Sequence, residues 1–312
     1  MARLTEAFEP QLATLVKTPP RGAGWVFEIK YDGYRAIASK RGDAVELRSR
    51  KGLRFGGLDA IRERIATLDA HDVVLDGEIC ALDPEGRPRF EALQAALGAH
   101  EDAIVYFVFD VLSLDGEDLR ERPLSERKKV LAKLVRSTTG GAVRRVVASS
   151  GDGGAFLEAT RSLGLEGLVA KRADRPYRAG RSLDWQKVKT EARQEMMIVG
   201  FTPPSGTRRG LGALLLGVHE GGQLRYAGKV GTGFDDATLG SLAKRLTAAI
   251  VAKSPVVDPP RMREARWVRP ELVAEVRFSE WTRDGRLRHP VFVGLRADKR
   301  PGDVVRERPS AT

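Results

Sequence analysis

The sequence predicts an α+β protein of two domains, and three observations lead to this prediction. The chain has 312 residues, and at roughly 100–200 residues per domain this length favours two domains. Up to about residue 192, short apolar runs alternate with longer amphipathic segments, as expected of strands and helices. Beyond that point, short apolar runs are separated by glycine-rich turns, which is typical of a small β-barrel. We therefore expect a mixed domain over 1–192 and a β-rich domain over 193–312.

Each element of the first domain follows from its own pattern. Continuous apolar runs bounded by turn residues predict strands at 25–29, 72–82 and 103–112. Apolar residues at helical spacing predict helices at 59–69, 124–136 and 154–163.

The second domain is predicted in the same way. Apolar runs that end in glycine predict strands at 195–201, 212–222 and 224–233. Helical spacing predicts one helix over 235–252, and more strand-like sequence follows it. The polar tail beyond residue 300 is expected to fray.

Charge and cysteine content narrow the classes of function. The net charge is +11, and the last 120 residues carry +8 of it, which favours a polyanionic partner such as nucleic acid. Cys80 is the single cysteine, which excludes an intrachain disulfide and a cysteine-rich zinc site. No apolar run approaches the roughly 20 residues that span a bilayer, and the first ten residues lack the apolar core of a signal peptide. We expect a cytosolic protein with no membrane partner.

Four lysines stand at or near predicted strands in an arginine-rich chain: Lys30, Lys171, Lys187 and Lys189. Arginine cannot act as a deprotonated amine, so lysines kept at these positions hint at lysine chemistry. Nearby cations would lower the pKa of Lys30 and make its amine nucleophilic. Lys187 and Lys189 are two apart and share a strand face with Trp185. The alternative for each is an ordinary surface lysine.

Carboxylates and aromatic rings recur in similar positions. Asp76 and Glu78 are also two apart in a strand, and Glu166 begins another strand. Such carboxylates suit Mg²⁺, which usually takes one or two of them together with phosphate oxygens; the alternative is solvated charge. Phe107 and Phe109 are candidates either for core packing or for stacking on a nucleobase. The chain has no Walker A or dinucleotide glycine motif, so nucleotide chemistry would have to use side chains.

Six segments resemble, in family order, the nucleotidyltransferase motifs of ATP-dependent DNA ligases, RNA ligases and mRNA capping enzymes. They are KYDGYR (30–35), SRKG (49–52), DGE (76–78), FVFD (107–110), EGLVAK (166–171) and WQKVK (185–189). The C-terminal segments resemble the last motif of DNA ligases and the ligase module of bacterial ligase D, the end-joining enzyme. These segments are 205–217, 224–234, 277–292 and 288–299.

The resemblance implies a fold and a domain composition. It implies an N-terminal nucleotidyltransferase (adenylation) domain of antiparallel sheets with helices, followed by a C-terminal OB-fold β-barrel that binds DNA. The polymerase and nuclease modules often fused to ligase D would not fit in 312 residues, so the resemblance implies a stand-alone ligase.

The resemblance also implies a role for each matching residue. Lys30 would attack the α-phosphate of ATP and carry AMP, in a motif with Asp32 and Arg35. Glu78 and Glu166 would lie by a divalent metal, Mg²⁺ or Mn²⁺. Contacts to the base, ribose and phosphates would come from Glu28, Arg50, Glu78, Phe109, Val169, Lys171, Trp185, Lys187 and Lys189. The pyrophosphate would be met by Arg288, Arg296, Asp298 and Lys299.

The implied activity is the sealing of 5′-phosphate/3′-hydroxyl breaks in duplex DNA through a lysyl-AMP and a DNA-adenylate, in DNA repair, recombination or end joining. The implied partners are nicked or broken duplex DNA, a Ku-type end-binding protein and a separate end-joining polymerase. A monomer at the nucleoid, in the bacterial cytoplasm, is expected. The alternatives are an RNA ligase or capping-type nucleotidyltransferase, and a nucleic-acid-binding protein that keeps the fold without catalysis.

Overall fold

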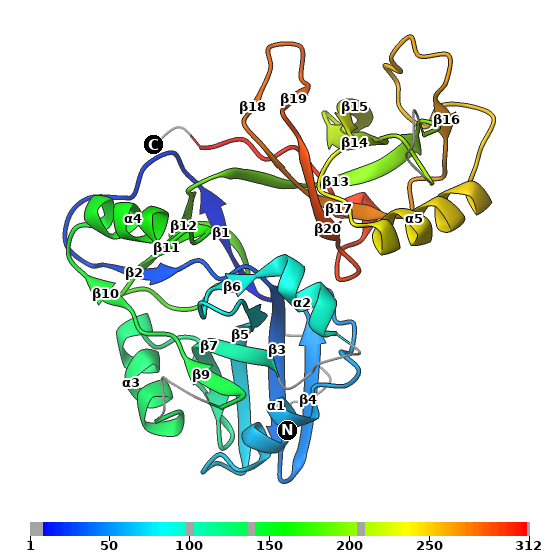
Figure 1. Cartoon of the computed structure of the whole chain (residues 1–312). Helices are drawn as coiled ribbons and strands as arrows, with labels where there is room; N and C mark the ends of the chain where they lie inside the picture. Colours follow the sequence, from blue (N-terminus) through cyan, green and yellow to red (C-terminus); the bar gives the residue numbers. More distant parts are fainter. Residues whose placement is uncertain (1–8, 98–102, 137–140, 205–209, 311–312) are drawn as a thin grey trace. The chain divides into compact units, whose positions relative to one another are not determined.

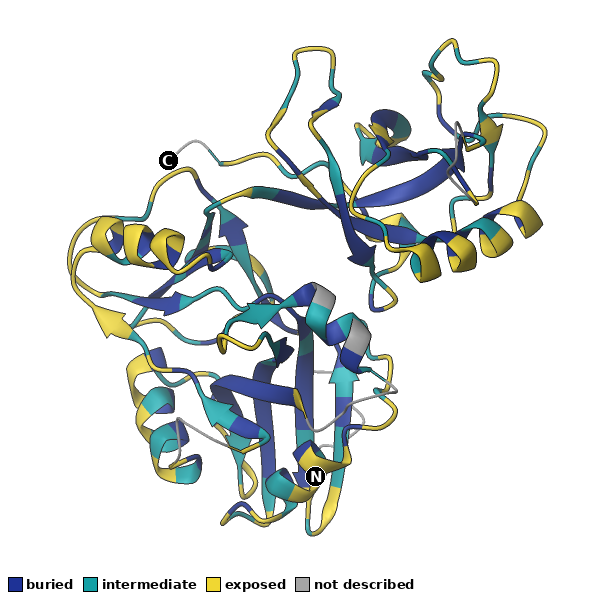
Figure 2. Ribbon diagram, viewed as in Figure 1, coloured by how far each residue is buried: buried dark blue, intermediate teal, exposed yellow. Residues whose placement is uncertain are grey.

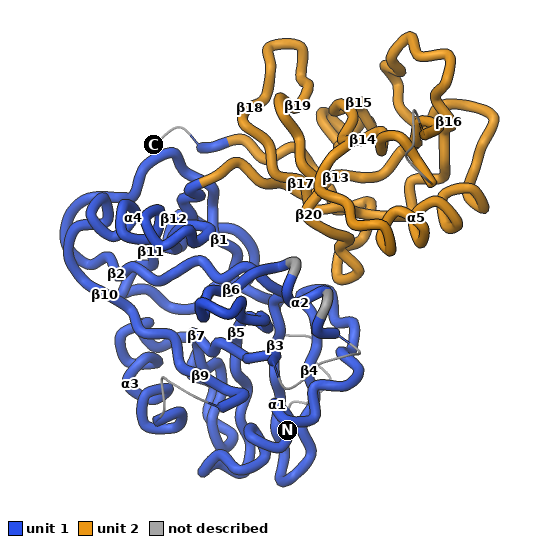
Figure 3. The backbone as a smooth tube through the Cα atoms, viewed as in Figure 1, with its two compact units in different colours: residues 1–190, 309–312 blue, residues 191–308 orange. Residues whose placement is uncertain are grey.

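The computed structural model describes residues 9–97, 103–136, 141–204 and 210–310. The chain divides into two compact units, unit 1 with residues 1–190 and 309–312, and unit 2 with residues 191–308 (Figure 3). The boundary expected after residue 192 therefore lies within β13 (Ala192–Phe201), the first strand of unit 2. The N-terminal segment 1–8 and residues 205–209 of the glycine-rich segment 205–217 lie outside the described residues.

Unit 1 contains two β-sheets. Sheet A comprises β1 (Gln11–Leu15), β2 (Trp25–Ile29), β10 (Ser149–Ser150), β11 (Gly167–Arg172) and β12 (Gly180–Lys189), in the order β1-β12-β11-β2-β10. Sheet B comprises β3 (Tyr34–Arg41), β4 (Ala44–Ser49), β5 (Asp72–Leu82), β6 (Pro88–Arg89), β7 (Ile104–Leu114), β8 (Glu117–Asp118) and β9 (Val143–Arg145). Its order is β4-β3-β5-β7-β8, with β6 beside β5 and β9 beside β7 (Figure 1). Pairing is antiparallel except for β1 with β12 and β9 with β7.

The helices of unit 1 are α1 (Asp59–Ala66), α2 (Phe90–Ala96), α3 (Leu124–Leu134) and α4 (Gly153–Ser162). Three of them confirm predicted helices; α2 was not predicted, because it is short and begins at the fully buried Phe90 without a side-chain cap. α4 begins after Asp152, whose carboxylate accepts a hydrogen bond from the Ala155 N–H at 2.8 Å. Across the described residues, no helix is both long and apolar enough to cross a membrane.

Side chains from both sheets of unit 1 pack into one buried cluster. Sheet B contributes Ile37, Cys80 and Phe109, and sheet A contributes Trp185. Of the strands that carry these side chains, β3, β5 and β7 are largely buried in Figure 2, and β12 is buried around Trp185. The predicted site residues therefore lie on strands that are held rigidly by a shared core.

Unit 2 is built on a bent antiparallel sheet. Its strands are β13, β14 (Leu214–Glu220), β15 (Gln223–Val230), β17 (Val273–Phe278) and β20 (Val291–Leu295), in the order β15-β14-β13-β17-β20, with β16 (Arg266–Trp267) beside β13. Pairing shifts register in β13–β14, β14–β15 and β17–β20, and such bulges bend strands. α5 (Asp236–Ala248) packs Leu239, Leu242 and Leu246 into the same core. A hairpin of β18 (Glu280–Trp281) and β19 (Leu287–Arg288) completes the predicted OB-fold domain.

Over its described residues, 301–310, the polar tail is held by hydrogen bonds, contrary to the expectation that it frays. It begins with the 3₁₀ helix η2 (Pro301–Asp303), after which Val304 is buried. The His219 N–H donates to the Val304 carbonyl at 3.0 Å, and the Gln194 side-chain amide donates to the Val305 carbonyl at 3.0 Å. Hydrogen bonds and ion pairs, rather than apolar burial, hold most of these residues, so the polar sequence did not indicate the contacts.

Candidate active site

The register of sheet A places the predicted residues of three strands on one face. Val169 lies opposite Glu28 on one side and opposite Lys187 on the other, and Lys171 lies opposite Trp185. Directly opposite residues share a face, and so do alternate residues along a strand. The residues that share this face of sheet A are Glu28, Lys30, Val169, Lys171, Trp185, Lys187 and Lys189.

A glycine turn connects this face to sheet B. A Cβ atom on Gly33 would lie 2.1 Å from the Ile79 carbonyl oxygen and 2.8 Å from the Cys80 Sγ, so only glycine allows this approach of the turn to β5. The chain then enters β3, where Arg35 lies opposite Glu78. The spacing of the KYDGYR motif thus joins a lysine on one sheet to an arginine on the other.

Lys30 forms an ion pair with Glu166, which lies 136 residues further along the chain. The Lys30 side chain is 20% exposed and that of Glu166 is 7% exposed. Burial and the neighbouring Lys189 would lower the pKa of Lys30, but the charges of Glu166 and Asp32 and the hydrogen bond to Glu166 together raise it overall. The prediction that surrounding cations depress this pKa is wrong for the ligand-free chain, because a carboxylate is the nearest charge.

Four charged groups lie close enough to the buried Cys80, near Lys30, to act on its thiol. Burial raises the pKa of its thiol, and the charges of Glu78, Asp32, Lys30 and Glu166 all act on it. In the described residues no group of three or more potential ligands forms a closed metal cage. Carboxylates that supply one or two ligands, with phosphate oxygens supplying the rest, are the arrangement that Mg²⁺ usually takes. The oxygen donors of Glu78 and Glu166 therefore fit a divalent cation that arrives with a nucleotide.

Arg35 is held by Asp76, which the sequence analysis considered only as a carboxylate suited to Mg²⁺, and the same carboxylate is held by Tyr177, which it gave no role. Its guanidinium donates to both oxygens of Asp76 at 2.7 and 2.5 Å, and the Tyr177 hydroxyl donates to the same carboxylate at 2.7 Å. Burial would lower the pKa of Arg35, but Asp76 raises it further than burial lowers it. The alternation with Glu78 marked Asp76 as a candidate, but it did not indicate the pairing of Asp76 with Arg35.

Phe109 lies at a β-bulge between β5 and β7. Val108 pairs with Gly77 and Asp110 pairs with Asp76, so Phe109 is the extra residue on its strand. Its ring is buried, with the Lys171 Nζ 4.2 Å and the Arg35 guanidinium carbon 4.9 Å from the ring centroid. The other candidate ring, Phe107, stacks on Tyr31 at 4.1 Å. Stacking of Phe109 on adenine stays a prediction.

Two lysines share the buried carboxylate of Glu28. Lys171 contacts the Oε2 atom at 2.7 Å, and Lys128, from α3, contacts the Oε1 atom. Burial would raise the pKa of Glu28, but the two ammonium groups lower it overall. Burial lowers the pKa of Lys171 to about 8, and Glu28 offsets this only in part. Lys128 was missed, because nothing in an amphipathic helix distinguishes it from the exposed Lys129.

The remaining predicted cations of unit 1 are partly exposed. Lys187 and Lys189 lie on the shared face of sheet A, beyond Trp185. Arg50 follows β4 at a turn in which the Gly52 N–H donates to the Ser49 carbonyl at 2.8 Å.

The four predicted pyrophosphate contacts all lie in unit 2. Arg296 is buried and donates to both oxygens of Asp298 at 2.8 Å and to Glu275 at 3.1 Å. Burial would lower the pKa of Arg296, but these carboxylates raise it. Lys299 pairs with Glu195 at 2.8 Å. By contrast, the pair of Arg288 with Glu280 is more than half exposed.

Two protein families match the chain. The family described as ATP dependent DNA ligase domain matches residues 4–189, and the family described as ATP dependent DNA ligase C terminal region matches residues 207–299. Both matched segments follow the division into units 1 and 2.

Individual proteins match over almost the whole chain. The multifunctional non-homologous end joining protein LigD of Pseudomonas aeruginosa is 42% identical over 98% of this chain and 37% of its own length, and that of Mycolicibacterium smegmatis is 40% identical over 97% and 40%. The chain thus spans about two fifths of the length of these relatives. A solved structure, described as mycobacterial DNA ligase D complexed with ATP and MES, is 37% identical with a TM-score of 0.66, and the match covers 95% of this chain and 98% of that one.

Proposed function

The chain belongs to the ATP-dependent DNA ligase family, and on that premise we propose that it seals 5′-phosphate/3′-hydroxyl breaks in duplex DNA. The observation that carries the proposal is the gathering of the family's motif residues around Lys30, from segments as distant as residues 28 and 189. AMP would pass from ATP to Lys30, then to the 5′-phosphate of the break. Attack by the 3′-hydroxyl would form the phosphodiester and release AMP.

Lys30 would be the nucleophile of the first reaction. Its Nζ atom would bond to the α-phosphorus as the bond to pyrophosphate breaks, and the amine would lose a proton. An ammonium has no lone pair for attack, so the ion pair with Glu166 marks the resting state and Glu166 must release Lys30 before reaction. Lys187 and Lys189, on the same face, would offset the charge that develops on the α-phosphate.

The other residues would position the nucleotide and the DNA end. Glu28 would meet the adenine edge, with Phe109 and Val169 on the two faces of the base. Arg35 and Arg50 would contact AMP or the 5′-phosphate. Among the remaining motif residues, Lys171 and Trp185 would line the base pocket, and Asp32 and Glu78 would lie beside the ribose.

Glu166 and Glu78 would hold a divalent cation, Mg²⁺ or Mn²⁺, that supplies charge neutralisation for the phosphates when bound. Around it, the chain's own cations would orient the phosphates and exclude alternative poses. In unit 2, Arg288, Arg296, Asp298 and Lys299 would act on the pyrophosphate.

The DNA would be bound through its backbone. Residues 193–312 carry a net charge of +8, so we expect affinity to fall steeply with salt and to depend little on sequence. The substrate would be nicked or broken duplex DNA, in repair or end joining at the nucleoid of a bacterial cytoplasm. A Ku-type end-binding protein and a separate polymerase would be partners of a monomeric ligase.

Label transfer tests the proposal. The chain is first freed of any bound AMP with pyrophosphate, then incubated with α-labelled ATP or GTP and Mg²⁺. We expect a covalent label from ATP that is absent in Lys30→Ala and that nicked DNA chases into a sealed product. Label from GTP alone would indicate capping chemistry, preference for RNA ends would indicate an RNA ligase, and no label on a folded chain would leave only nucleic-acid binding.

A further inference from the structure

On the shared face of sheet A, the buried carboxylate of Glu28 is contacted by two lysines. Lys171 takes one oxygen of Glu28 at 2.7 Å, and Lys128 takes the other. Each carboxylate oxygen has two lone pairs, so the two contacts leave acceptor capacity for a ligand. The three side chains are 3%, 2% and 16% exposed in the order Glu28, Lys171 and Lys128, which makes this the most enclosed charge cluster on the face.

The helix that carries Lys128 is fixed to the rest of unit 1 independently of Glu28. The preceding residue, Arg127, donates to both oxygens of Asp110 on β7 at 2.8 Å, and both side chains are fully buried. At the helix start, the Leu124 N–H donates to the Arg175 carbonyl at 3.0 Å. α3 is thus anchored on sheet B, while Lys128 reaches to Glu28 on sheet A. The anchoring of α3 therefore fixes the position of the Lys128 ammonium beside Glu28.

We propose that Lys128 is a positioning residue which, through Glu28, makes the site select a purine with a 6-amino group over one with a 6-oxo group. The inference rests on the proposed function, in which Glu28 meets the edge of the base. An ionised carboxylate only accepts hydrogen bonds, and adenine offers a 6-amino donor where guanine offers a carbonyl acceptor. A buried acceptor facing another acceptor leaves both unpaired, which is a strong basis for rejecting guanine.

Removal of Lys128 would relax this selection. The Oε1 atom of Glu28 would lose its partner, and the carboxyl group could rotate or take a proton. A protonated carboxyl group donates a hydrogen bond, so it would donate to the 6-oxo oxygen of guanine. Lys171 would still hold the other oxygen, so we expect the selection to weaken rather than to vanish.

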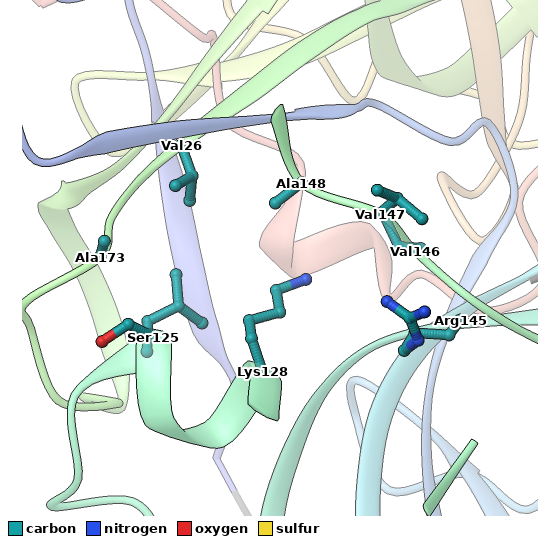
Figure 4. Close-up of a pocket in the computed structure, with 9 residues that line it drawn as sticks. Val26, Ser125, Lys128, Arg145, Val146, Val147, Ala148 and Ala173 are labelled. Carbon is teal, nitrogen blue, oxygen red and sulfur yellow. The ribbon is translucent and has the colours of Figure 1, made fainter. Parts of the chain in front are cut away.

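A cavity beside Lys128 makes a sharp test feasible. It has a volume of about 200 Å³, and Lys128 extends into it from α3, with Val26, Val147 and Ala148 on the opposite walls (Figure 4). Truncation to alanine would leave room there for a small alkylammonium ion. A methionine at the same position would fill much of that room without a charge.

The experiment measures lysyl-nucleotide formation without DNA, with α-labelled ATP and GTP, on wild type, Lys128→Met, Lys128→Arg and Lys128→Ala. For Lys128→Met we expect the ratio of kcat/KM for ATP to that for GTP to fall about tenfold or more, mainly through KM. Lys128→Arg should keep the ratio near wild type, because it keeps the charge. Added ethylammonium should restore the ratio in Lys128→Ala and leave Lys128→Met unchanged. The exposed neighbour Lys129, changed to Met, is the matched control.

The outcomes separate the inference from the proposed function. A wild-type ratio in Lys128→Met, with Lys129→Met also unchanged, overturns the role of Lys128. Equal losses with ATP and GTP in all three Lys128 variants, without ethylammonium rescue, would mean that Lys128 only supports the fold and would overturn it too. No label on the wild-type chain from either triphosphate overturns the proposed function together with the inference.

Discussion

Two lysines on the same face of sheet A each contact a buried carboxylate, yet their environments shift their pKa values in opposite directions. Lys30 pairs with Glu166, the charges of Asp32 and Lys189 also act on it, and its pKa is raised overall. Lys171 shares Glu28 with Lys128, and burial lowers its pKa to about 8. The first pair is electrically neutral, whereas the second cluster carries one excess positive charge.

The difference shows that the count of charges, more than the presence of a partner, sets the state of a buried group. At Lys30, Glu166 and Asp32 together outweigh burial and Lys189, whereas at Lys171 the carboxylate of Glu28 is shared with Lys128 and does not outweigh burial. At the Lys171 end, the aromatic rings of Phe109 and Trp185 lie 4.2 and 4.0 Å from the ammonium and stabilise the surplus cation in part. The predictions below test this contrast, from the largest expected effect to the smallest.

The largest effect is expected at Lys30. Lys30→Arg keeps a cation beside Glu166 but replaces the amine by a guanidinium that cannot lose its proton. We expect lysyl-AMP formation to fall below detection while the melting temperature changes little. Gel detection of labelled protein and thermal unfolding measure the two quantities, with Lys129→Arg as the control. Residual label in Lys30→Arg would show that another residue carries AMP.

The second effect is on stability, at the shared carboxylate. Glu28→Gln leaves the ammonium groups of Lys128 and Lys171 without a counter-charge, and removing one partner of a buried pair costs on the order of 3–5 kcal/mol. Glu166→Gln should destabilise less, because the Lys30 side chain is 20% exposed and can be hydrated. Urea unfolding measures both free energies, with the exposed Glu126→Gln as the control. Equal losses in the two variants would contradict the charge count.

The third effect is a dependence of stability on pH. The pKa of Lys171 is about 8 in the folded chain against 10.5 as its ordinary value, so the unfolded chain binds more protons between these values. Stability therefore rises with pH across this window, by an amount on the order of 3 kcal/mol for this group. The raised pKa of Lys30 acts oppositely: its contribution is complete below pH 10.5 and is lost as pH rises through the higher folded pKa.

Unfolding free energies of wild type and Lys171→Met from pH 7.5 to 10 measure this effect. The wild-type value should rise relative to that of Lys171→Met. A Lys30→Met control should run parallel to wild type in the same range. Parallel curves for wild type and Lys171→Met would show that Lys171 is not titrating in this window.

The sequence predicts which strands carry the site but not the charge count at each carboxylate. Alternation along 185–189 and the turn at Gly33 suffice to place the lysines on one face, because strand geometry is local. Pairing of Lys30 with Glu166 depends on contacts between segments more than 130 residues apart. No spacing rule indicates that contact, so the sequence did not reveal that carboxylates raise the pKa of Lys30 in the ligand-free chain.

In the helix α3, the sequence indicates even less clearly which charged side chain pairs with which carboxylate. The period of 124–136 predicts α3, but not that Arg127 is buried beside Leu124 and Leu131, nor which neighbouring lysine contacts a carboxylate. Lys128 and Lys129 differ only in direction by about 100° around the helix. That direction selects Glu28 for Lys128 and solvent for Lys129, and only the tertiary structure specifies it.

The smallest effect is expected in unit 2, where Arg288 and Glu280 pair at 2.8 Å with 58% and 59% of their side chains exposed. Glu280→Gln should change the free energy of unfolding by no more than about 1 kcal/mol, since water solvates both charges and screens their attraction. Glu275→Gln, which removes a carboxylate from the buried Arg296, should cost several times more, even though the N···O distance there is the longer 3.1 Å. Urea unfolding compares the two variants. A larger loss for Glu280→Gln would mean that distance rather than burial governs these pairs, and the contrast between Lys30 and Lys171 would then need a different cause.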